Sequence, residues 1–366
     1  NNKNIAIGNY ALDANMTHNQ GNIAIGHETL TNLAGSGALA NVFIGTQAGI
    51  SLTNADYNTG VGHGVMGEAS GNAITGLYNS GFGALALYNL AGAASSNTAI
   101  GYKAGFQSTT ASGSVFLGFT AGETVTTGNK NIAIGHDAMN GSTITGDNNI
   151  AIGASAGDAL TSGKENVFMG TDAGGAVTTT TRLVYIGFEA GAANANGIGN
   201  TAVGWKALRQ YDLEHTNTAI GAEAMSGAGA SNSCVAIGNE TLAGSTTTGA
   251  NGTVGIGYQA LKALTSGGGN IAVGFEAGLL VTDNTDNVMI GHQAFNASDS
   301  GDSENVVIGS NAGGAINHGS SDGNVLIGLS AGLGGAAALA DCVVIGKNAM
   351  KSTAGNAQSG TVAIGK

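Results

Sequence analysis

The sequence predicts an all-β protein, a parallel β-solenoid of about 21 coils with two short strands in each coil. The pentapeptide Asn131-Ile132-Ala133-Ile134-Gly135 returns in near-copies along the whole chain, and its closing glycine occurs 21 times at intervals of 17 to 21 residues. A period sustained over a whole chain indicates units that bury their apolar side chains only against their neighbours. Apolar residues alternate within the pentapeptide, which is the period of a β-strand and not of a helix.

Repeat positions are numbered here from the closing glycine, position 0, so that Ile134 stands at position −1. Position −1 is large and apolar in all 21 copies, and position −3 is Ile, Val, Thr or Ser. Branched apolar residues at alternate positions are typical of the buried face of a strand. We therefore expect the −1 residues to form the internal core. The clearest of them are Ile7, Ile25, Ile44, Ile100, Ile134, Ile152, Ile220, Ile237, Ile290 and Ile345.

Position −2 points to the other face of the strand. It is Ala in many copies, but Phe43, Phe116, Phe168 and Tyr185 are large and aromatic. An apolar outer face needs a cover, and a single chain offers none. These four residues are therefore the candidate inter-chain face.

Position −4 is Asn in 15 of the 21 copies. Asn side chains stacked at the spacing of neighbouring strands, about 4.8 Å, can hydrogen-bond as a ladder and also fix a turn. The alternative interpretation is a row of surface amides that binds a ligand. The predicted ladder includes Asn4, Asn22, Asn41, Asn97, Asn131, Asn149, Asn166, Asn217 and Asn270.

A second short strand is expected after the glycine at position 0. Glycine permits a positive φ or close packing of the backbone at a corner. Ala at position +3 in most copies lets the following segment lie close to the first strand, and a loop rich in Thr, Ser and Gly absorbs the differences in repeat length.

Composition excludes several classes of partner. The chain has 366 residues, a formal net charge of −12 and only 11 Lys plus Arg, so we expect no nucleic-acid binding. Apolar runs are too short for a membrane helix, and we expect no membrane insertion. The repeat spans 1–366 as one domain, and because both ends fall inside the repeat we expect a fragment of a longer fibre.

Over residues 4–365, the motif Asn-x-(Val/Ile/Thr)-Ala-Ile-Gly followed by x-x-Ala-Gly resembles the head repeats of trimeric autotransporter adhesins. With its Thr-Thr-Gly loops, as at Thr126-Thr127-Gly128, it is still more similar to the repeat region of phage tail fibres. The resemblance implies a left-handed parallel β-roll, a homotrimer, an extracellular place on a virion or cell surface, and a role in attachment. The expected function is a shaft that projects a receptor-binding tip, with host glycan or protein recognised mainly by parts outside this chain. The alternatives are a bacterial surface adhesin, or a solenoid that binds glycan or ice directly through its repeat face.

Candidate sites have structural alternatives. We interpret the acidic residues at position +2 as a solvated edge, and the alternative is cation binding. We interpret the aromatic residues at position +1 as packing against a loop or chain, and the alternative is stacking on sugar rings. Cys234 and Cys342 are read as buried structural thiols. No residue set suits catalysis, so we expect neither an enzyme nor a cofactor. The oxygen-rich loop with Asp299, Asp302 and Glu304 is a weak calcium candidate.

Overall fold

The computed structural model describes residues 3–14, 18–33, 37–67, 73–210, 215–227, 229–244, 249–298, 300–314, 316, 319–334, 338–352 and 356–366. These residues contain strands and turns but no helix, which confirms the predicted all-β parallel solenoid. The chain divides into two compact units, Asn1–Leu183 and Val184–Lys366, which carry the same repeat.

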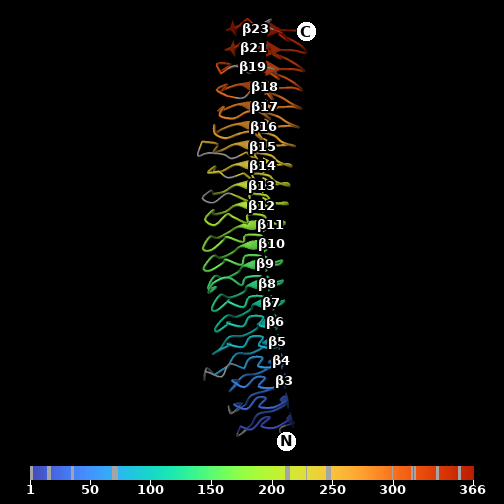
Figure 1. The fold of residues 1–366 in the computed structure, drawn as a ribbon, viewed down its shortest axis with the longest axis vertical. Helices are drawn as coiled ribbons and strands as arrows, with labels where there is room; N and C mark the ends of the chain where they lie inside the picture. The colour runs from blue at the N-terminus through green and yellow to red at the C-terminus, as the bar shows by residue number, and fades with distance from the viewer. Residues whose placement is uncertain are drawn as a thin grey trace. The chain divides into compact units, whose positions relative to one another are not determined.

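In the first unit, each strand pairs in parallel with the next one along the chain, one coil later (Figure 1). The register is set by the repeat, so Ile132 lies beside Ile150 and Ala133 beside Ala151. The strands are β1 (Ile5–Ile7), β2 (Ile23–Ile25), β3 (Val42–Ile44), β4 (Thr59–Val61), β5 (Ser80–Phe82), β6 (Thr98–Ile100), β7 (Val115–Leu117), β8 (Ile132–Ile134), β9 (Ile150–Ile152) and β10 (Val167–Met169).

The second unit repeats this arrangement. A short additional pair, β20 (Leu339–Ala340) with β22 (Gln358–Ser359), lies outside the main series. The series itself consists of β11 (Val184–Ile186), β12 (Thr201–Val203), β13 (Thr218–Ile220), β14 (Val235–Ile237), β15 (Val254–Ile256), β16 (Ile271–Val273), β17 (Val288–Ile290), β18 (Val306–Ile308), β19 (Val325–Ile327), β21 (Val343–Ile345) and β23 (Val362–Ile364).

The prediction of two strands in each coil is wrong for most coils, because the segment after the glycine alternates between positive and negative φ. In one coil, Gly135, Asp137 and Met139 have φ of 132°, 55° and 51°. Such a backbone is not extended, yet it still bonds from coil to coil. The Asp137 N–H donates to the Phe119 carbonyl at 3.2 Å, and the Met139 N–H donates to the Ala156 carbonyl at 3.0 Å.

The glycine at position 0 is required for two reasons. Its φ lies where residues with a side chain are strained. In addition, a Cβ on Gly135 would lie 2.6 Å from the carbonyl oxygen of Gly153 in the next coil. Successive coils therefore approach at this corner more closely than any other residue allows.

The prediction of the core placed the wrong face of the strand inside. Position −2 is buried in all but the first and last strands, whereas position −1 faces outward, with Ile44 38 % and Ile100 42 % exposed. Ile7, Ile220, Ile237, Ile290 and Ile345 are also exposed, and Ile25, Ile134 and Ile152 are half-buried. The physical reason is space. Each coil closes on itself within a short length, so that Ala at −2 and Ala at +3 fit inside while a column of isoleucines does not.

Phe43, Phe116, Phe168 and Tyr185 are fully buried, so their assignment to an inter-chain face is also wrong. Each of these four aromatic residues fills space that glycine leaves free at position +4, six residues later. A Cβ on Gly122 would lie 2.2 Å from Phe116, and one on Gly105, at +4 of the preceding coil, would lie 2.5 Å from it. In the coil with small Ala133, position +4 is instead the buried Met139. The core volume is thus shared between positions −2 and +4.

The Asn ladder is confirmed. The Oδ1 atom of Asn131 accepts hydrogen bonds from the backbone N–H and from the Nδ2 of Asn149, at 2.9 and 3.2 Å. The Nδ2 of Asn149 also donates to the Gly163 carbonyl at 2.9 Å, which closes its own coil. The ladder residues are buried, apart from half-buried Asn4, and this argues against a row of surface amides for ligands.

The two cysteines occupy the ladder position and are free and buried, as predicted. The Cys234 N–H donates to Asn217 Oδ1 at 2.8 Å, and its thiol donates to the Ala250 carbonyl at 3.2 Å. Burial raises the pKa of the Cys234 thiol. Both observations fit a structural thiol and not a reactive one.

The shared core volume predicts a compensating pair of substitutions. Phe116→Ala should lower the free energy of unfolding by about 3–5 kcal/mol, because it leaves a cavity. Gly122→Met should also destabilise, because its side chain meets Phe116. The double variant should recover part of the loss, since it copies the Ala133 and Met139 coil. Denaturant unfolding of the four proteins would measure the coupling, and simple addition of the two losses would contradict it.

The ladder predicts a large effect from a single amide. Asn149→Ala should destabilise by about 1–3 kcal/mol for each buried group left unpaired, since Asn166 loses its acceptor and Gly163 its donor. The matched control is Asn239→Ala, whose exposed amide donates to the Ala222 carbonyl. It should change the free energy of unfolding by less than about 0.5 kcal/mol. Equal effects of both variants would show that the ladder contributes no special stability.

Candidate interaction surface

The outer face of the strands is an apolar surface. Side chains at −3 and −1 point away from the core, and neither column contains a charged residue in any of the 21 copies. These two columns are called the outer stripe. Its exposed members include Ile44, Phe82, Ile100, Leu117 and Met169 in the first unit, and Ile220, Ile237, Ile271, Ile290 and Ile345 in the second.

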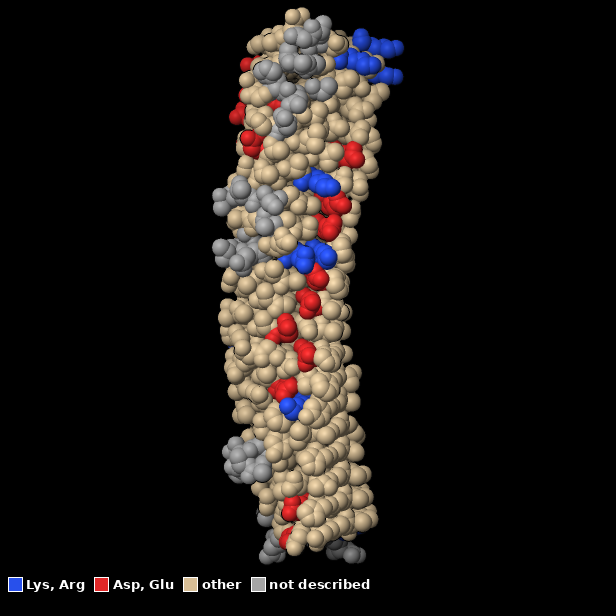
Figure 2. Space-filling view, viewed as in Figure 1, with Lys and Arg blue, Asp and Glu red and all other residues tan. Residues whose placement is uncertain are grey.

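Charged residues gather elsewhere. On the face drawn in Figure 2, most Asp, Glu, Lys and Arg side chains form a narrow line with uncharged areas beside it, and towards the C-terminal end charged side chains also lie at both edges. Soluble monomers rarely expose contiguous apolar patches larger than a few hundred Å². The outer stripe is therefore the strongest candidate for an interaction surface in each unit.

Aromatic rings at position +1 stack on one another from coil to coil. In the first unit, Tyr102, Phe119 and His136 form a stack with centroid distances of 5.3 and 5.2 Å. In the second unit, Tyr258, Phe275 and His292 repeat the same order at 5.1 and 5.2 Å. Because the faces of these rings cover each other, packing explains the column better than sugar stacking does.

Charged side chains at position +2 form ion pairs with position +5 of the following coil. Glu189 at +2 bonds Arg209 at 2.6 Å, and Lys103 at +2 bonds Glu123 at 3.0 Å in the reverse arrangement of charge. A hydrogen bond from Lys262 lowers the pKa of Glu240. Within the described ranges, no group of three His, Cys, Asp or Glu side chains could hold a metal ion. The column behaves as a solvated edge whose charges bond along the stack.

Residues of the calcium candidate are placed in part. Asp299 lies outside the described residues. Asp302 is fully buried, where its Oδ2 accepts from the Ser298 hydroxyl at 2.9 Å and its Oδ1 from the Ser321 N–H at 2.8 Å. Glu304 is exposed on a turn with a φ of 58°. The hydrogen bonds of Asp302 therefore hold its loop in place.

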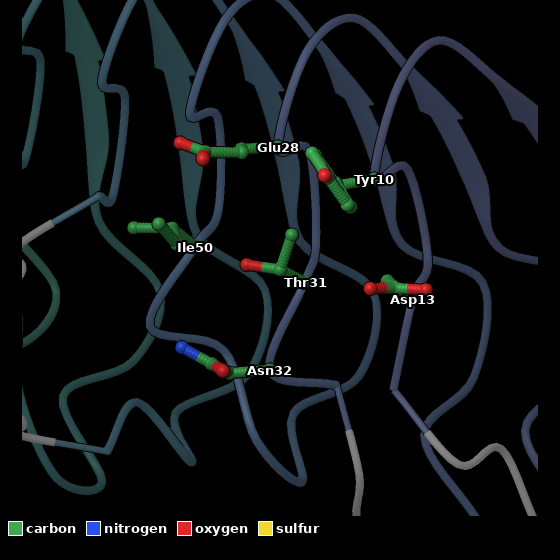
Figure 3. A pocket seen from close by; sticks show the side chains of 6 residues that line it. All are labelled: Tyr10, Asp13, Glu28, Thr31, Asn32 and Ile50. Atoms are coloured by element: carbon green, nitrogen blue, oxygen red, sulfur yellow. The ribbon is translucent and has the colours of Figure 1, made fainter.

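The first unit also has a hollow that the sequence interpretation did not single out. It lies over three consecutive coils near β1 and β2 and has a volume of about 490 Å³ (Figure 3). One signal could have found it, because Tyr10 is the only aromatic residue at position +2 in the chain. Its lining consists of Tyr10, Asp13, Glu28, Thr31, Asn32 and Ile50.

None of the described residues forms a helix long and apolar enough to span a membrane. No protein-family model matches the chain, and no curated protein matches it either.

Proposed function

We propose that this chain is a shaft segment of an extracellular attachment fibre, in which three copies pack through their outer stripes. The exposed apolar stripe carries this proposal. This surface consists of Ile, Val, Leu, Met and Phe, with Thr or Ser at −3 in five coils, and it continues from strand to strand. It needs a cover, and a second and third copy of the same chain offer a matching surface. The number three comes from the resemblance to tail-fibre and adhesin repeats.

Support for a shaft comes from how each coil is held. Backbone hydrogen bonds, the Asn ladder and the glycine corner all join a coil to its neighbours along the stack. Such a scaffold keeps a fixed spacing under load, while differences in repeat length are confined to loops. It suits the projection of a receptor-binding part from a virion or cell surface. The host glycan or protein would be recognised mainly by that part.

The inter-chain contact predicts a change of mass on substitution in the outer stripe. The chain of 35.5 kDa should sediment as a trimer at micromolar concentration. Ile100→Asp combined with Ile237→Asp should dissociate it, because each places a carboxylate in an apolar contact. The matched control, Thr110→Asp, changes an exposed loop residue and should stay trimeric. A stable wild-type monomer would overturn the association.

The shaft role predicts that attachment is insensitive to the number of coils. Deleting 201–217 joins Asn200 to Thr218, restores the repeat motif, keeps Gly191 beside Tyr185 and removes one coil, about 4.8 Å of stacking length. A fibre that contains this shortened chain should keep its secondary structure by circular dichroism and attach to its natural surface as the unshortened fibre does. Loss of attachment in a folded, shortened fibre would place recognition within these coils and contradict the proposal.

A further inference from the structure

We propose that the hollow beside β1 and β2 binds a neutral saccharide, with one pyranose ring against Tyr10 and its hydroxyl groups bonded to Asp13, Glu28 and Asn32. This site is independent of the outer stripe. Its volume of about 490 Å³ falls within the usual range of small-molecule sites and is large enough for one or two sugar rings.

Tyr10 differs from the stacked rings of the chain. Its side chain is 55 % exposed, and its ring stands at 85° to that of His27, with centroids 6.1 Å apart. By contrast, Tyr57 and Tyr78 stack at 7°, so that each covers a face of the other. Tyr10 therefore keeps ring surface for an apolar partner. The C–H face of a pyranose is such a partner, and an aromatic ring with a polar tip suits a contact that is half apolar and half wet.

Polar groups line the same hollow, from the coil of Tyr10 and from the next coil. Glu28 accepts a hydrogen bond from Gln47 Nε2 at 2.9 Å, and its side chain is 33 % exposed, so the carboxylate is oriented but accessible. Asp13 and Asn32 are exposed at the opposite side of the hollow, with Thr31 between them and Glu28 (Figure 3). Carboxylates accept bonds from sugar hydroxyl groups, and the Asn32 amide can donate as well as accept.

The charge of the hollow selects the class of sugar. Asp13 and Glu28 lie in it, while no Lys or Arg lines it. Like charge disfavours a sialic acid, a uronic acid or a phosphate. A neutral hexose or N-acetylhexosamine is the ligand class that fits both the ring and the carboxylates.

Saturation-transfer-difference NMR on the full chain tests the site with the methyl glycosides of glucose, galactose and N-acetylglucosamine. At least one should bind with a Kd in the millimolar range, on the order of 1–10 mM, as expected for a shallow site. Methyl sialoside should give no saturable signal. Absence of binding by all three neutral glycosides at about ten times that Kd would overturn the proposal and leave the shaft proposal untouched.

Substitutions in the hollow test whether the glycoside binds there. Tyr10→Ala should weaken binding about tenfold, the usual size of a lost aromatic contact, whereas Tyr10→Phe should keep most of it. Glu28→Gln should weaken binding less than Tyr10→Ala, because an amide still bonds hydroxyl groups. The matched control is Tyr78→Ala, which removes an equally exposed tyrosine from a stacked pair. An equal loss in the Tyr78 variant, or no loss in Tyr10→Ala with the chain folded, would show that the glycoside binds elsewhere.

Discussion

Each coil must close within 17 to 21 residues, and this leaves a narrow interior. Only small side chains fit on the inner face of the strand unless position +4 is glycine. Phe116 therefore requires glycine at 105 and 122. At the corner, stacking brings the glycines of successive coils within reach of each other's carbonyls. Large branched residues are therefore placed outside, and the apolar outer stripe follows from the geometry of the interior.

Much of the architecture could be predicted from the sequence, because the repeat fixes strand position and register at once. The Asn ladder was also predictable, since Asn at one repeat position stacks at the spacing of neighbouring strands. Which face of the strand is buried could not be predicted, because alternation shows that the two faces differ but not which of them lies inside. The pairing of Phe43 with Gly49, and of Tyr185 with Gly191, is the signal that identifies position −2 as internal.

The second segment of the coil could not be read as a turn from its residue types. Asp137 and Met139 have positive φ although neither is glycine, and ordinary propensity does not favour this. Hydrogen bonds to the preceding and following coils hold the conformation, so it is imposed by stacking and not by local sequence. The hollow at Tyr10 was missed for a related reason. Its lining residues come from three coils, and only the fold brings them together.

The hydrogen bonds of the Asn ladder all run in one direction, and the ladder is weaker where another residue replaces Asn. Every Asn oxygen accepts from the coil that follows it, so within a unit the amides point the same way and polarise one another. Where Cys replaces Asn, as at 234 and 342, a thiol donates in place of an amide, and a thiol is a weak donor. Thr253 also replaces Asn, and its buried hydroxyl group makes no hydrogen bond. Under tension along the stack, the second unit should therefore begin to unravel next to Cys234, Thr253 or Cys342. A fibre built from such coils would unfold in steps under tension, and unfolding would begin at these particular coils.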